Sequence, residues 1–270
     1  MKKIPVLVLS CAVIFSMAGN ICAAQEEIVI SCSGDNQELI RVLAVEFEKA
    51  NPGTKVDVPE SIGSSGGIKA LTRGTCDLAR IARPLKDKEK ADGLDYKIFA
   101  YSPVVFAVNP GVKGIDSMTF EQLLGVFSGR IASWSELGGK KQKIYTAQRE
   151  SGDSCLTVLE KNIPGWDSIE KSSNQIIYST PEMIRTIAKY DNTIGYAPLS
   201  MVKNSGLKVI KIAGVYPSVE NIKDGSYRLA VPFGIAWKGE LQGAVRAFVD
   251  FILSPEGQSI IADNGAVPLI

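Results

Sequence analysis

Apolar residues in the first third of the chain follow two different spacings. Residues 26–32 (EEIVISC) form a short, largely apolar run that is typical of a buried strand. Leu39, Leu43 and Phe47 then recur every four residues, which indicates the apolar face of a helix. The Asn-Pro-Gly run at residues 51–53 ends that pattern, because proline cannot continue the helical hydrogen bonds and glycine accepts left-handed backbone angles.

The next segment repeats the order of strand, turn and helix. Residues 55–62 alternate like a strand, and a glycine-rich turn follows at residues 63–67. A short helix is predicted at residues 68–73, ended by Gly74, and a further strand at residues 76–82. This order predicts a parallel sheet flanked by helices.

A second set of elements begins after a long extended run at residues 102–111 (SPVVFAVNPG). The chain returns through another extended run at residues 227–237. One long run that leaves and one that returns predict an α/β fold with two lobes joined by two hinge strands. The predicted lobes comprise residues 25–105 with 226–270 (lobe 1) and residues 106–225 (lobe 2). Between and after these runs, the pattern predicts a helix at residues 119–127, a strand at 143–149, a helix from residue 156 and an amphipathic helix around 245–252.

The first residues have the pattern of a targeting segment. Lys2 and Lys3 precede an apolar run at residues 4–17, and two alanines close the segment. Residues 1–24 are therefore a predicted signal peptide, and the remaining chain is expected in the periplasm. A lipid anchor at Cys22 is not expected, because the residues before it lack the small side chain that precedes a lipidated cysteine.

Charge and composition exclude several classes of function. The chain has 30 basic and 29 acidic residues and no histidine. Removing residues 1–24 takes away two lysines, and a net charge near −1 favours neither nucleic acid nor an anionic membrane as a partner. Without histidine, serine-histidine catalysis and histidine-ligated zinc are excluded. No metal, cofactor or catalytic residue is predicted, and the protein is expected to be a monomer.

Three cysteines remain after the signal peptide. Cys32, Cys76 and Cys155 would lie in an oxidising compartment, where at most one internal disulfide can form among them. If Cys32 and Cys76 lie on adjacent strands, they are the favoured pair.

Three predicted strand-to-helix turns combine glycine with short polar side chains. A helix start has free backbone N–H groups and carries about half a positive charge, so it binds anions. In a parallel sheet such turns gather at the carboxyl ends of the strands, where ligands bind. The three turns are residues 34–36, 63–67 and 151–154.

Each turn also has a purely structural interpretation. Asp35 with Glu38 three residues later matches a capping box, and Ser65 is a typical N-cap. Ser151 or Asp153 could cap the third helix. Three such turns in one chain, two of them with arginines nearby, favour a ligand.

Three arginines lie near these turns. Arg149 directly precedes the third turn, and Arg80 and Arg83 lie on the strand that follows the second. The planar guanidinium matches an oxyanion with two hydrogen bonds. Alternation along the strand places Arg80 and Ala82 on one face and Arg83 elsewhere, and either arginine could instead form a surface salt bridge. Arg149 is the firmest candidate.

In these motifs the chain resembles the periplasmic phosphate-binding proteins (PstS-like), the substrate-binding components of ABC-type phosphate transporters. The resemblance covers nearly the whole chain after the signal peptide. The segments that carry it include GSSGGIKAL, DLARIARPL, VVFAVNP, RESGDS, IGYAPLSMV and FVDFILSPEGQSIIADNGAVPL. It implies a two-lobed periplasmic solute-binding fold (type II) that closes on one oxyanion and delivers it to a membrane permease.

The resemblance also implies which positions hold the ligand. By position these fall on Asp35 and Asn36, on Ser64, on Ala82, and on Arg149 with the three residues from 153 to 155. Ser64 and Arg149 match the residue types of the family, and the others depart. The predicted ligand-binding set is Asp35, Asn36, Ser64, Ser65, Arg80, Arg83, Arg149, Gly152, Asp153, Ser154 and Cys155.

The departures leave the ligand open. A carboxylate about 4 Å from an anion costs on the order of 4 kcal/mol at an effective dielectric near 20, so Asp35 and Asp153 oppose a phosphate dianion unless their charge is offset. The leading hypothesis is capture of phosphate or a related oxyanion. The alternatives are another oxyanion or a small carboxylate as ligand, or a sensor with the same fold. An enzyme that uses Asp153 and Cys155 is disfavoured, because no histidine or metal cluster accompanies them.

Overall fold

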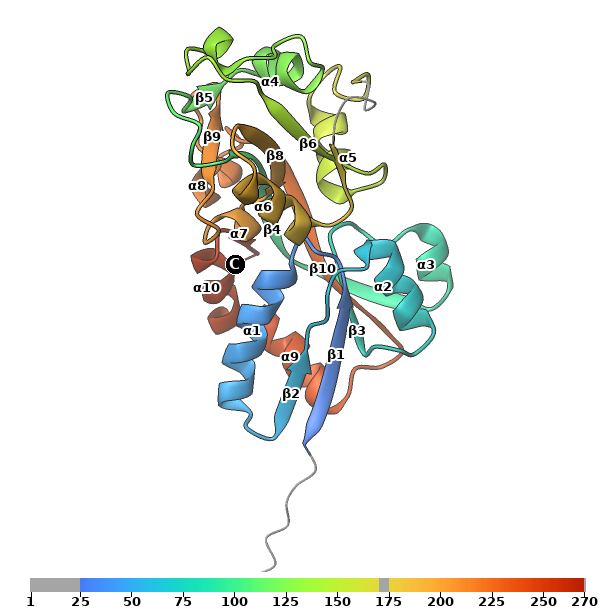
Figure 1. Ribbon diagram of the computed structural model, residues 1–270. Coiled ribbons are helices and arrows are strands. Elements are labelled where there is room, and N and C mark those ends of the chain that lie inside the picture. Colours follow the sequence, from blue (N-terminus) through green and yellow to red (C-terminus); the bar gives the residue numbers. More distant parts are fainter. Residues whose placement is uncertain (1–24, 170–174, 270) are drawn as a thin grey trace, which may run out of the picture.

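The computed structural model describes residues 25–169 and 175–269. The predicted signal peptide and Cys22 lie outside the described residues. Within those residues, no helix is long and apolar enough to span a bilayer. Figure 1 shows two lobes, one above the other, with extended strands running from one into the other.

Lobe 1, the lower one in Figure 1, is built on the predicted parallel strands. β1 lies between β2 and β3 and is parallel to both. β10 runs antiparallel to β3 on one side and to β4 on the other, and β11 pairs with β4. The strands are β1 (Glu26–Cys32), β2 (Thr54–Asp57), β3 (Leu78–Ile81), β4 (Leu94–Val108), β10 (Ala230–Lys238) and β11 (Val267–Pro268).

Lobe 2 continues the same sheet. β8 pairs antiparallel with the second part of β4, and β6 and β7 follow in parallel. β9 also pairs with β4, and β5 pairs with β9. The strands are β5 (Ser117–Met118), β6 (Tyr145–Arg149), β7 (Gln175–Ile177), β8 (Thr193–Pro198) and β9 (Lys208–Ile212).

Two long strands connect the lobes, as the two extended runs predict. β4 pairs with β10 up to Pro103 and with β8 from Val104 onward. The returning chain meets it there, because Ala230 lies opposite Pro103 and the Val104 N–H donates to the Leu229 carbonyl at 2.8 Å. The structure is thus a two-lobed α/β fold with two hinge strands. The lobe boundaries at residues 105 and 225 stay a prediction.

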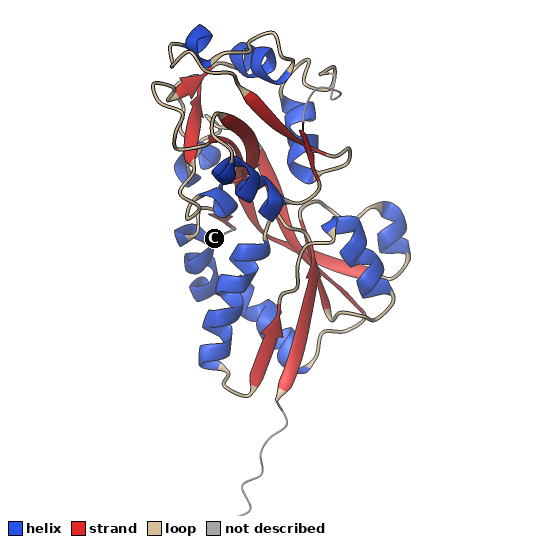
Figure 2. Ribbon diagram, in the orientation of Figure 1, coloured by secondary structure: helices blue, strands red, loops and turns tan. Residues whose placement is uncertain are grey.

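Helices cover the sheet because each long helix carries an apolar stripe (Figure 2). In α1, Leu39, Leu43 and Phe47 are buried, as their spacing predicts. The Phe47 ring packs edge-on against Phe248 of α9, with centroids 5.1 Å apart. The helices are α1 (Gln37–Ala50), α2 (Gly63–Thr72), α3 (Asp87–Ala91), α4 (Phe120–Phe127), the 3₁₀ helix η1 (Trp134–Leu137), α5 (Ser154–Asn162), α6 (Thr180–Lys189), α7 (Leu199–Val202), α8 (Val219–Lys223), α9 (Gly243–Leu253) and α10 (Pro255–Asp263).

The glycine-rich turn differs from its prediction. α2 begins at Gly63 rather than at residue 68, so most of the run belongs to the helix. Gly67 is required because α2 packs closely on β1: a β-carbon there would come within 2.1 Å of the Cys32 side chain. The close approach places the start of α2 beside the end of β1.

Cys32 and Cys76, the favoured pair, do not form a disulfide in the structure. Cys32, Cys76 and Cys155 are all buried and free. Although β1 and β3 are adjacent, Cys32 lies opposite Arg80 in the register, and its thiol donates to the Gly63 and Ser64 carbonyls at the start of α2. Burial raises the pKa of Cys32 to about 12, so this thiol is unreactive near neutral pH.

Candidate anion-binding site

Several strand ends converge on a cavity of about 240 Å³ between the lobes. The turns after β1, β2, β3, β6 and β7 all contribute to its wall, as expected for the carboxyl ends of strands. The lining residues are Ser33, Gly34, Asp35, Ser61, Ile62, Gly63, Ser64, Ser65, Gly66, Arg83, Arg149, Glu150, Ser151, Gly152, Asp153, Ser154 and Thr180.

On the lobe 1 side, two helices begin without a side-chain cap. The N-cap residues of α1 and α2 are Asn36 and Ile62, and neither accepts a hydrogen bond from its helix. The alternative interpretation of Asp35 and Ser65 as caps is therefore wrong, and both residues line the cavity instead. The Asp35 and Gly63 N–H groups donate to the Ser33 and Ser61 hydroxyls, and no N-cap side chain takes the N–H groups that follow them.

Ser64 supplies a hydroxyl on the same side. Its Oγ accepts a hydrogen bond from the Ala82 N–H at 3.2 Å, which fixes the side chain beside the end of β3. Within the part of the chain that the structure describes, no acceptor takes the hydroxyl hydrogen. Ser64 can therefore donate to a ligand in the cavity.

On the lobe 2 side, both helices are capped by side chains. Asp153 Oδ1 accepts from the Leu156 N–H at 2.9 Å at the start of α5. Ser179 Oγ accepts from the Glu182 N–H at 3.3 Å at the start of α6. Asp153 is thus the N-cap of the third predicted turn, and these two helices offer fewer free donors than α1 and α2.

Arg149 provides the positive charge of the lobe 2 side. It ends β6 and is buried, with 5% of its surface exposed. Its Nη2 lies 2.9 Å from Asp153 Oδ2, its Nε lies 3.4 Å from Glu150 Oε2, and its Nη1 donates to Thr180 Oγ1 at 2.8 Å. The guanidinium is therefore held in place by groups of its own lobe before any ligand binds.

Thr180 joins the two lobes across the cavity. Its hydroxyl donates to Asp35 Oδ1 on the lobe 1 side, while its oxygen accepts from Arg149. Thr180 is 1% exposed and was missed by the sequence prediction. The signal was present: Ser179, Pro181 and Glu182 mark a fourth helix start that follows a strand.

Burial shifts the ionisation of the two aspartates in the cavity wall. Burial raises the pKa of Asp35, against the opposing effects of Arg149 and Thr180. Burial and the nearby Asp35 raise the pKa of Asp153 to about 7. Burial lowers the pKa of Arg149, but the carboxylates around it, Asp153 first, outweigh that effect and raise it overall, so Arg149 stays charged.

Arg80 does not take the predicted role. Its side chain is buried within lobe 1 and does not line the cavity. Its guanidinium donates to the carbonyls of Ile30, Ser33 (2.9 Å) and Pro59 (2.7 Å) and to Gln37 Oε1 (3.2 Å). Arg80 therefore links β1 and the turn after it to the segment that precedes α2. It can affect a ligand only indirectly, by positioning these two turns.

The other predicted residues are divided between the cavity and its surroundings. Arg83 lines the cavity, but its guanidinium is bound at two points by Glu89, at 2.7 and 2.8 Å. Gly152 and Ser154 also line it. Asn36 and Cys155 are buried behind the wall, where the Asn36 amide donates to the Ile81 carbonyl at 3.2 Å.

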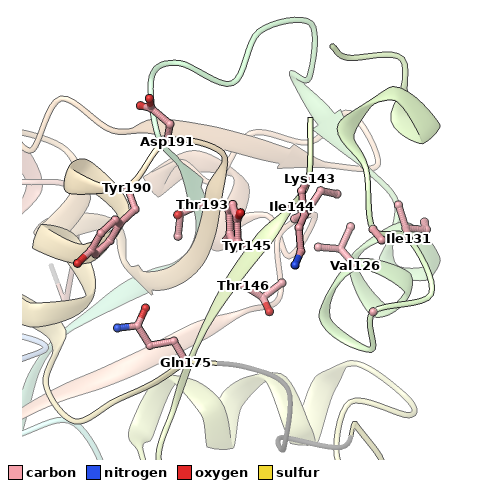
Figure 3. A pocket seen from close by; sticks show the side chains of 12 residues that line it. Val126, Ile131, Lys143, Ile144, Tyr145, Thr146, Gln175, Tyr190, Asp191 and Thr193 are labelled. Carbon is pink, nitrogen blue, oxygen red and sulfur yellow. The ribbon is translucent and has the colours of Figure 1, made fainter. Parts of the chain in front are cut away.

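A larger cavity, of about 680 Å³, lies at the opposite end of the lobe 2 strands (Figure 3). Tyr145 and Thr193, at the beginnings of β6 and β8, contribute to its wall, whereas Arg149 ends β6 at the cleft. Among the described residues of that wall, Lys143 is the single cation, and Asp191 offsets its charge. The smaller cavity, which has the arginines and the helix starts, is therefore the candidate anion site.

The described residues contain no group of three or more acidic, cysteine or histidine side chains that could hold a metal ion. Residues 22–256 match the family described as the PBP superfamily domain. The chain belongs to the PBP superfamily.

Several PBP relatives are named for phosphate. The chain is 27% identical over 280 residues to the phosphate-binding protein PstS of Borreliella burgdorferi, with 98% of both chains covered. It is 42% identical over 156 residues to the phosphate-binding protein PstS 2 of Streptococcus agalactiae, with 54% of this chain and 52% of that protein covered.

A solved PBP structure has the same architecture. It is a putative phosphate ABC transporter substrate-binding protein with bound phosphate from Clostridium perfringens, with a TM-score of 0.80, 27% identity and coverage of 91% of this chain and all of that chain. The predicted resemblance to the PstS-like PBP family is confirmed. These are substrate-binding proteins, so the enzyme alternative is not retained.

Proposed function

We propose that this protein is an exported, monomeric solute-binding protein that captures phosphate between its two lobes and delivers it to the permease of an ABC transporter. One observation carries the proposal: the buried, charged Arg149 faces two helix starts that have no side-chain cap, across a cavity of about 240 Å³. A site that closes on an oxyanion needs hydrogen-bond donors on one lobe and a positive charge on the other. The names of the relatives support phosphate as the anion.

The proposed ligand contacts come from both lobes. Lobe 1 offers the helix starts near residues 35 and 63 with the Ser64 and Ser65 hydroxyls, and lobe 2 offers Arg149, Thr180 and the turn at 152–154. Closure would remove these groups from water together and so strengthen each hydrogen bond to the anion.

The proposal is tested by isothermal titration calorimetry on phosphate-stripped protein, with phosphate first and then sulfate, nitrate and acetate. We expect saturable 1:1 binding of phosphate, and a smaller radius of gyration by X-ray scattering when phosphate is added. Delivery is tested separately: the phosphate-loaded protein should stimulate ATP hydrolysis by the permease in proteoliposomes, and the phosphate-free protein should not.

A changed ligand is the second candidate, and the cavity charges favour it. Asp35, Glu150 and Asp153 all line the cavity, and each ionised carboxylate opposes a dianion. Another oxyanion of lower charge, or a small carboxylate, meets less repulsion there. If the calorimeter shows no heat with phosphate but saturable binding of another anion, this second candidate replaces the first.

A further inference from the structure

Thr180 stands between an acid and a cation in the cavity wall. A threonine hydroxyl has one hydrogen to donate and two lone pairs to accept with. Arg149 Nη1 donates to this oxygen at 2.8 Å, and the hydrogen points to Asp35 Oδ1. While Asp35 is ionised, Thr180 therefore has no hydrogen left for a ligand, and the pair presents only acceptors to an anion.

A proton on Asp35 reverses this arrangement. The protonated carboxyl can donate to the second lone pair of Thr180, and the threonine hydrogen is then free to turn toward the cavity. Both residues line the cavity, so the freed hydrogen can reach a bound oxyanion. The same proton removes one negative charge from the wall. One protonation thus supplies a donor and relieves a repulsion.

The charges around Asp35 decide where such a proton rests. Arg149 of β6, Glu150 and Asp153 of the turn after β6, and the Cys155 thiol of α5 face it from lobe 2, and Thr180 contacts it from α6. Arg149 contacts Asp153 directly and reaches Asp35 only through Thr180. Burial and the nearby Asp35 in turn raise the pKa of Asp153 to about 7, so the two carboxyls compete for one proton. Since the guanidinium contacts Asp153 and not Asp35, the contact geometry favours a proton on Asp35 over one on Asp153.

We propose that Asp35 takes part in anion binding in its protonated form, so that anion binding is coupled to a proton on Asp35 and the Asp35–Thr180 pair becomes a hydrogen-bond donor to the ligand. The inference rests on the proposed function. The proton comes from solvent and is released again when the anion leaves, and no covalent bond is made or broken in the ligand.

The test is calorimetry with phosphate between pH 6 and pH 9, in pairs of buffers that differ in ionisation enthalpy, on the full protein. Asp35→Asn keeps an amide donor toward Thr180 and cannot ionise, so its pH profile should keep the contributions of phosphate and Asp153 and lose that of Asp35. Wild-type affinity should fall more steeply with rising pH. Above the pH at which Asp35 ionises in the ligand-free protein, the additional fall should be about tenfold per pH unit. Binding should then take up about one more proton in the wild type than in Asp35→Asn. The matched control is Asp95→Asn, an exposed acid on β4, which should behave like wild type.

A second variant tests the inference if the Asp35→Asn protein does not fold. Thr180→Val removes the donor but keeps the acid, and it should bind phosphate more weakly than wild type at pH 6, the most acidic condition of the series. Identical pH profiles and proton counts for wild type and Asp35→Asn would overturn the inference and leave phosphate binding standing. No phosphate heat in the wild-type protein at any pH would instead overturn the proposed function.

Discussion

The two walls of the cavity stabilise an anion by different means. The lobe 1 wall has two uncapped helix starts and the serines of α2, which are neutral donors. The lobe 2 wall has capped helices and one buried arginine whose three nitrogens already have partners. Arg83 also lines the lobe 1 wall, but Glu89 pairs with it. Under the proposed function, the lobe 1 donors would orient the oxygens of the anion, and Arg149 would supply most of the attraction.

The largest effect should come from Arg149→Ala in the lobe 2 wall. Removing it takes away one of the two cavity arginines and leaves the Asp153 carboxyl unpaired beside the anion, so phosphate affinity should fall at least about 100-fold, or about 3 kcal/mol. Calorimetry at pH 7 measures this loss. Arg185→Ala removes an exposed arginine of α6 and should leave the affinity unchanged. Wild-type affinity in Arg149→Ala would mean that lobe 1 alone binds the anion.

Arg80→Met tests the interior of lobe 1. It leaves three backbone carbonyls without their donor, so the free energy of unfolding should fall by about 3 kcal/mol. Urea denaturation measures this, with the exposed Arg73→Met as the control. Phosphate affinity of the folded variant should change less than about threefold. A variant that is stable but does not bind phosphate would show that Arg80 acts on the ligand after all.

The stability of the ligand-free protein should depend on pH through the two aspartates. A carboxyl whose pKa is raised by folding stabilises the folded state below its unfolded pKa and loses that contribution as pH rises through its folded pKa. For Asp153 this window runs from about 4 to about 7, and Asp35 acts in the same direction. We expect the free energy of unfolding to fall by on the order of 2 kcal/mol between pH 5 and pH 8.

Chemical denaturation in phosphate-free buffer at four pH values between 5 and 8 gives that slope. Asp35→Asn should flatten it. The carboxyls of Glu48 and Glu89 have lowered pKa values, so their contributions change below this range and do not affect the slope. A stability that rises with pH in the wild-type protein would show that both aspartates are fully ionised.

Ser64→Ala should have the smallest effect. It removes one neutral donor to the ligand and one acceptor of the Ala82 N–H, worth about 1 kcal/mol, so phosphate affinity should fall about fivefold. Calorimetry can resolve this difference, with the exposed Ser226→Ala as the control. A loss of affinity as large as that of Arg149→Ala would show that the two walls do not differ in how strongly they contribute to binding.

Local sequence patterns predicted much of the fold, because they depend on neighbouring residues. The apolar spacing of α1, its end at residues 51–53 and the order of parallel strands follow from such patterns. Three of the turns around the cavity were predicted in the same way, from glycine and short polar residues that precede a helix.

The remaining features depend on contacts between distant residues. Thr180 meets Asp35 across 145 positions of sequence, and nothing near either residue indicates the partner. Arg80 looks like a surface or ligand residue because arginine is seldom buried; its four partners become visible only when β1, β3 and the segment before α2 are assembled.

The position of β10 has a consequence for the order of folding. This strand is made near the end of the chain, yet it lies between β3 and β4, which are complete by residue 108. Without residues 230–238, the edges of β3 and β4 that pair with β10 would have unpaired backbone N–H and C=O groups. The first lobe to be synthesised is therefore the last to close, and a chain cut short before β10 would present two open sheet edges to other chains.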